Sequence, residues 1–137
     1  MADVESSMGG KFDKQAIPRE ARRLWAKLLQ EPLRSEEALR GEVEAYSVLI
    51  EKVALKKEFF DQTTARRLTR ISLRVLDAWG ELDEEARVLA QAAIRYFVVS
   101  EDGDDDFESP TGLDDDDAVM KAVLQHLGRA DLLGGSV

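Results

Sequence analysis

Apolar residues recur at spacings of three and four positions along most of the chain, which is the period of an amphipathic helix. The first such stretch begins at Pro18, a residue suited to the first turn of a helix, and ends near Glu31, just before Pro32. The second follows Ser35, which can act as an N-cap, and continues to about Lys57. These patterns predict two helices in the first half of the chain.

Three further segments show the same period. Asp61 can cap a helix that ends at Gly80, and Asp83 can cap the next one, which ends near Val99. A last amphipathic segment ends at Gly128. Because no segment alternates apolar and polar residues over the length of a strand, we expect an all-α fold, a compact bundle of about five helices.

The chain has the length of one ordinary domain. Its 137 residues are 44% apolar, which is enough to fill a single core. Residues 1–16 mix glycine, serine and charge without periodicity, which predicts a flexible N-terminal arm, and residues 134–137 form a short tail. We therefore expect one helical domain over residues 17–133. A domain of this size can close its own core, so a monomer or weak dimer is expected.

The chain has no cysteine, which excludes disulfides, thiolate metal sites and cysteine nucleophiles. No stretch has the uninterrupted apolar length of a secretory signal or a membrane span. The expected protein is soluble and cytoplasmic, without a membrane span.

The net charge of −9 arises entirely from the last quarter of the chain. Residues 1–100 carry 17 basic and 17 acidic side chains, whereas residues 101–137 carry 2 basic and 11 acidic ones. Such a field repels phosphate backbones, so nucleic acid is not an expected partner.

Most of this charge falls in residues 100–117, where ten side chains are acidic and a long loop is expected before the last helix. Crowded carboxylates either bind something positive or stay solvated. Compared with the calcium loop of an EF-hand, Phe107 stands where the glycine belongs and Leu113 where the glutamate belongs. Two interpretations stay open: a solvated acidic loop, or a weak and irregular divalent-cation site. The candidate ligands for the second are Asp102, Asp104, Asp106 and Asp114.

Three residues of this stretch have expected structural roles. Phe107 is its only large aromatic side chain and is expected to fold into the core as the anchor of the loop. Gly112 permits a backbone conformation that other residues resist, and Asp115, or its neighbour Asp114, is expected to cap the last helix.

Several of these residues also occur in a recognisable order. Tyr96-Phe97-Val98 closes a helix, and Asp106-Phe107, Pro110 and then Gly112-Leu113 precede paired aspartates and a new helix. Over about residues 93–127 the chain resembles the YkvA-like family of small helical domains of unknown function. This resemblance implies a helical fold and no particular activity.

Four arginines lie close together in the predicted third helix: Arg66, Arg67, Arg70 and Arg74. Three of them recur every four residues and therefore line one face. The stripe is interpreted as a solvated face paired with nearby carboxylates, as a dock for the acidic loop, or as a surface for an acidic partner.

No motif of an enzyme is present. The chain lacks a phosphate-binding glycine loop, a nucleophile elbow and a zinc-binding histidine pair, and its one histidine, His126, has no evident catalytic partner. We therefore expect no cofactor and no enzymatic activity. The expected function is a protein-interaction or regulatory module presenting an acidic loop, and the alternative is a small divalent-cation-binding domain. The candidate partner-binding residues are the four arginines together with Asp105 and Glu108.

Overall fold

The computed structural model describes residues 12–56, 62–98 and 113–134. Within these ranges it contains five α-helices and no strand, which confirms the predicted all-α bundle. The α-helices are α2 (Arg22–Leu29), α3 (Glu36–Lys56), α4 (Gln62–Asp77), α5 (Glu84–Val98) and α7 (Asp114–His126). Short 3-10 turns accompany them: η1 (Lys14–Ala16), η2 (Arg19–Ala21), η3 (Trp79–Glu81) and η4 (Ala130–Leu133).

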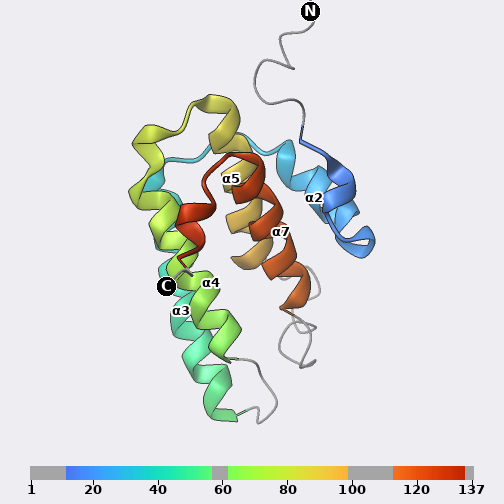
Figure 1. Cartoon of the computed structure of the whole chain (residues 1–137). Helices are drawn as coiled ribbons and strands as arrows, with labels where there is room; N and C mark the ends of the chain where they lie inside the picture. The colour runs from blue at the N-terminus through green and yellow to red at the C-terminus, as the bar shows by residue number, and fades with distance from the viewer. Residues whose placement is uncertain (1–11, 57–61, 99–112, 135–137) are drawn as a thin grey trace, which may run out of the picture.

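The helices form two connected groups (Figure 1). α3 and α4 run antiparallel as a long hairpin, and α5 packs against both α2 and α7 as well as against α3. α4 also contacts α7 and η4, so the C-terminal part of the chain returns to the hairpin. None of the described helices has the length and apolar character needed to cross a bilayer.

One continuous core joins all of these helices. α3 buries residues spaced by three and four positions, namely Leu39, Val43, Tyr46 and Ile50. α5 buries Ala90, Ala92 and Ala93 beside Ile94 and Phe97, and the small alanine side chains let neighbouring helices approach closely. Trp25, Trp79 and Tyr46 are buried in this core, and Tyr96 is half-buried.

Local signals set several helix ends as predicted. Ser35 Oγ accepts a hydrogen bond from the Ala38 N–H at 3.0 Å, and Asp83 Oδ1 accepts one from the Ala86 N–H at 2.8 Å. At the end of α7, Gly128 has φ of 72°, and the next N–H bonds back to the carbonyl of Leu124 at 2.8 Å. The proposed cap at Asp61 lies outside the described residues.

The predicted end of the third helix at Gly80 is wrong. α4 ends at Asp77, and Gly80 lies inside η3 without a positive φ. The Glu81 N–H bonds to the carbonyl of Ala78 at 2.8 Å, which tightens the chain into a 3-10 turn. This turn buries Trp79, so a packing requirement rather than glycine ends the helix.

The last residues of the predicted N-terminal arm pack against the helices. Phe12 packs against the core, with its ring 5.5 Å from that of Trp25 and 5.2 Å from that of His126, measured between centroids. Residues 12–16 therefore belong to the helical domain, and residues 1–11 lie outside the described part of the chain. Gly134, assigned to the tail, ends η4.

A polar network holds the connection between α2 and α3 against α5. Arg95 donates two hydrogen bonds to the Glu31 carboxylate, at 3.0 and 3.1 Å, and a third to Glu42 at 3.0 Å. Glu42 also accepts a bond from Arg34 at 2.6 Å. Gln91, which is 1% exposed, bonds to the backbone of the same connection. The network compensates for the desolvation of its members.

Candidate binding groove

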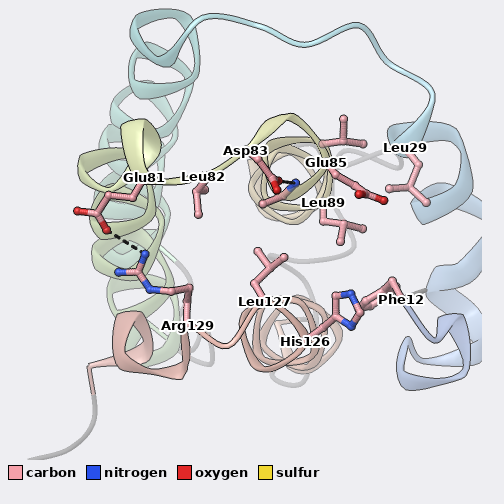
Figure 2. Close-up of a pocket in the computed structure, with 12 residues that line it drawn as sticks. Phe12, Leu29, Glu81, Leu82, Asp83, Glu85, Leu89, His126, Leu127 and Arg129 are labelled. Carbon is pink, nitrogen blue, oxygen red and sulfur yellow. Dashed lines mark hydrogen bonds and ion pairs between the residues drawn. The ribbon is translucent and has the colours of Figure 1, made fainter. Parts of the chain in front are cut away.

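A groove of about 560 Å³ lies between the start of α5 and the end of α7 (Figure 2). The turn at η3, the end of α2 and residue Phe12 complete its walls. Concave sites with an apolar lining and a few polar groups are the usual places where proteins bind ligands or partner side chains. This groove is therefore the candidate functional site.

Four leucines contribute to the apolar lining of the groove. Leu89 on α5 and Leu127 after α7 are half-buried and point toward one another across it (Figure 2). Leu82, at 8% exposure, lies between them and the α3–α4 hairpin, while Leu29 and Phe12 lie at the opposite end. An apolar side chain entering this space would remove both itself and these leucines from water.

An ion pair closes one end of the groove. Arg129 donates to Glu81 across 2.9 Å, and the same guanidinium bonds to both oxygens of Asp131 at 3.1 and 3.2 Å. The hydrogen bond from Arg129 lowers the pKa of Asp131 below its ordinary value. Both carboxylates therefore share one cation, which leaves this end with a net negative charge.

Acidic side chains also line the wall of the groove that is formed by the start of α5. One carboxylate oxygen of Asp83 accepts the N-cap hydrogen bond of α5, and Glu85 follows in the first helical turn. Glu85 is exposed and makes no ion pair with any described residue. A lysine or arginine on a bound segment could therefore pair with Glu85 without breaking an existing contact.

Of the arginine stripe, the two N-terminal members are paired with carboxylates. Arg66 binds Glu51 of α3 through Nε at 2.8 Å and Nη2 at 2.6 Å. Arg67 donates to Asp117, in the first turn of α7, at 2.9 Å. These contacts agree with the interpretation of a face paired with nearby carboxylates, and Arg67 joins α4 to the helix that follows the acidic stretch.

The other two arginines differ from each other. Arg70 is exposed, makes no ion pair with a described residue, and borders a small cavity of about 200 Å³ between α3 and α4. Arg74 is half-buried beside Gly134, and its Nη1 is buried with no hydrogen-bond partner among the described residues. The structure thus spreads the four arginines over different environments.

The predicted cap at the start of α7 requires correction. Leu113 occupies the N-cap position and no side chain caps the helix, while Asp115 lies within the first turn. Burial, with smaller contributions from Glu20 and Asp114, raises the pKa of Asp115 above its ordinary value. The predicted cap is displaced because Leu113 is buried in the core. The helix therefore begins directly after Leu113, and the aspartates fall inside its first turn.

Most of the acidic stretch lies outside the described residues. This applies to the candidate metal ligands Asp102, Asp104 and Asp106, to the partner-binding candidates Asp105 and Glu108, and to Phe107 and Gly112. Of the four candidate ligands only Asp114 is described, and it is exposed. Within the described ranges no three side chains of the metal-binding types gather into a group.

The groove has no specific signature in the sequence. Leu82, Leu89 and Leu127 lie in or beside segments whose apolar spacing predicts helices, but no pattern in the sequence brings the three together. Their convergence depends on the pairing of α5 with α7, two helices whose order in the chain says nothing about which sides face each other. One feature of the sequence could have indicated the groove. Glu81 and Glu85 lie on either side of the apolar residue Leu82 at the start of a predicted helix.

No family model matches the chain, and neither a curated protein nor a solved structure matches it. The resemblance to the YkvA-like family remains a prediction that rests on the residues quoted above.

Proposed function

We propose that the protein is a non-enzymatic protein-interaction module of the cytoplasm, and that the groove between α5 and α7 is its docking site. The observation that carries this proposal is the facing pair Leu89 and Leu127, left half-exposed in a groove whose rim is acidic. A lone half-exposed leucine is ordinary, but converging leucines in a concave site favour a partner side chain.

The charge of the rim selects the kind of partner. The rim carries three acidic side chains, Glu81, Asp83 and Glu85, and one arginine, Arg129, which already pairs with Glu81, so the rim attracts basic groups. The acidic run in residues 101–117 adds to this long-range field. The favoured ligand is a short protein segment with an apolar side chain that enters the groove and lysines or arginines on either side of it.

A pair of labelled peptides tests this proposal. One is an amphipathic peptide with leucines on one helical face and lysines on the other, and the second has glutamates in place of the lysines. Fluorescence anisotropy should show saturable binding of the first peptide only. The binding should weaken as salt is added, since rim charges act mainly through screened Coulomb attraction.

Matched variants locate the site. Glu85→Lys, at the groove, should weaken binding by roughly fivefold, equivalent to ~1 kcal/mol for an exposed pair. Glu84→Lys, in the same helical turn but outside the groove, should have a clearly smaller effect. Leu89→Ser should abolish binding, whereas Leu33→Ser, at an exposed leucine elsewhere, should not. Equal effects of the two lysine variants would show that the peptide binds the acidic protein nonspecifically and would contradict the proposed site.

A further inference from the structure

A second surface, separate from the groove, lies on the solvent side of α3. Val48 is 57% exposed and Leu55 is 88% exposed, and the two are seven residues apart, so they lie on one line along the helix. Leu49, at 42% exposure, follows Val48 in the chain and lies on the adjoining side of the helix. Another molecule that covered this line of α3 would remove both large aliphatic side chains, Val48 and Leu55, from water.

About two helical turns before Val48, toward the start of α3, the same line reaches Gly41. Gly41 is exposed, and a Cβ placed on it would meet nothing within 4 Å. Glycine destabilises a helix interior relative to alanine, and nothing within 4 Å of Gly41 requires the absence of a side chain. The line Gly41, Val48 and Leu55 thus has a small residue at one end, a large one at the other, and Val48 at its centre.

This arrangement is complementary to itself when reversed. If two copies of α3 pack antiparallel about a two-fold axis at Val48, each Leu55 comes level with Gly41 of the other copy, because both are seven residues from the axis. The large side chain then meets the position that has no side chain. A two-fold contact requires this kind of self-complementary patch.

The charges along the face have the same symmetry. Lys52 lies four residues after Val48 and Glu44 lies four residues before it, and both are exposed. In the antiparallel pair, Lys52 of one copy is level with Glu44 of the other, on both sides of the axis. A parallel pair would instead place like charges level with each other, so the charges favour the antiparallel arrangement.

We propose that the chain self-associates as a weak symmetric dimer through the exposed face of α3, with Val48 on the two-fold axis and Leu55 of each copy seated over Gly41 of the other. The occupant of this surface is a second copy of the same chain. A contact between single helices is small, which makes the dimer dissociate readily. The groove between α5 and α7 lies on other elements, so this proposal does not depend on the proposed function.

Sedimentation velocity of the whole chain, between about 5 µM and about 500 µM, should show a concentration-dependent monomer–dimer equilibrium. Leu55→Glu should raise the dimer dissociation constant by about tenfold or more. Gly41→Leu should also weaken the dimer while raising the melting temperature of the monomer, because leucine is the better helix former. Because Gly41→Leu weakens the dimer but raises the melting temperature, its effect on self-association cannot come from loss of the fold. A monomer throughout the concentration range would overturn the proposal.

Charge swaps test the orientation. Glu44→Lys alone and Lys52→Glu alone should each weaken self-association, since each places like charges level across the axis. A mixture of the two variants should recover it as a heterodimer, in which every level pair is again of opposite charge. Failure of the mixture to recover association would rule out the antiparallel arrangement.

A disulfide gives an independent measurement of the axis. Because the chain has no cysteine, Val48→Cys introduces a single thiol, and two such thiols on the axis lie within disulfide range. Mild oxidation should convert the Val48→Cys variant to a covalent dimer much faster than the Leu33→Cys control. Equal rates would show that the thiols meet only by random collision and would contradict the assigned axis.

Discussion

The side-chain amide of Gln91 supplies the hydrogen bonds that Arg34 and its neighbours would otherwise lack. Its Oε1 accepts from the backbone N–H of Arg34 at 2.8 Å, and its Nε2 donates to the carbonyl of Pro32 at 3.0 Å. The residues joined are 57 and 59 positions apart in the chain, so this one side chain fixes where α3 begins relative to α5.

Replacing Gln91 with leucine, which keeps the size and removes both polar atoms, should therefore destabilise the protein. Two backbone groups lose their partners next to the core, which costs about 1–3 kcal/mol. Urea unfolding followed by circular dichroism measures the loss. The control is Gln125→Leu, at an exposed glutamine on α7, which should change the free energy of unfolding little.

The stability of the protein should depend on Glu31 in the acid range. Hydrogen bonds from Arg95, aided by the charges of Arg95 and Arg34 against the opposing effect of burial, lower the pKa of Glu31 below its ordinary value of 4.5. A carboxylate with a lowered folded-state pKa contributes stability that is present above the unfolded value and is lost as the pH falls through the folded one.

The stabilising effect of Glu31 over glutamine should therefore be largest near neutral pH and disappear in strong acid. Unfolding of the native chain and of Glu31→Gln is compared at ~pH 7 and at ~pH 2. Glu37→Gln, at an exposed site, provides the control. A difference that stays constant over this range would contradict the role of the carboxylate charge.

Asp115 should show the opposite dependence. Because burial raises its folded-state pKa, its contribution is most favourable at low pH and is lost as the pH rises through the folded value. Asp115→Asn should therefore stabilise the protein at neutral pH and have little effect below the ordinary pKa of 3.8. Asp114→Asn, which removes an exposed charge from the same helix start, should not stabilise it, because that charge favours the helix dipole. Equal effects of both changes would contradict the assignment to burial.

Two glycines with the same backbone conformation should respond differently to alanine. Gly128 has φ of 72° in open space, so Gly128→Ala should cost about 1–2 kcal/mol from the left-handed backbone alone. Gly134 has φ of 70°, and a Cβ there would overlap the guanidinium of Arg74. Gly134→Ala should therefore be more destabilising than Gly128→Ala. It has the same backbone strain, and its new methyl group also pushes η4 away from Arg74 on α4.

Amide hydrogen exchange distinguishes these two effects. Protection at Leu132 and Gly134, whose N–H groups bond within η4, should fall in Gly134→Ala and remain in Gly128→Ala. Combining Gly134→Ala with Arg74→Ala should restore part of the protection by removing the overlap. No recovery in the combined variant would show that backbone strain alone is responsible.

The features that were predicted from sequence are those set by residues close together in the chain. Ser35, Asp83 and Gly128 each bond to groups within five residues, so composition and spacing were sufficient to place them. Gly80 was misassigned because the burial of Trp79, a tertiary effect, tightened the turn before the glycine could end the helix.

The candidate site could not be predicted in the same way. Leu89 and Leu127 meet only when α5 packs against α7, and the hydrogen bonds of Gln91 require α5 to lie beside the connection after α2. Periodicity identifies which side of a helix is apolar but does not identify the helix that covers it. Of the three interpretations of the arginine stripe, pairing with nearby carboxylates is observed at Arg66 and Arg67, but the sequence did not specify the partners on α3 and α7.

The packing of α2 against α5 also determines the order in which the fold can form. α3 and α4 are neighbours in the chain and can associate as a hairpin with little loss of chain entropy, whereas α2 must bridge that whole hairpin to reach Gln91 and Arg95. The hairpin is therefore expected to form early in folding. The N-terminal helix is then expected to dock last, and the fluorescence of Trp25 would report that step in a variant that lacks Trp79.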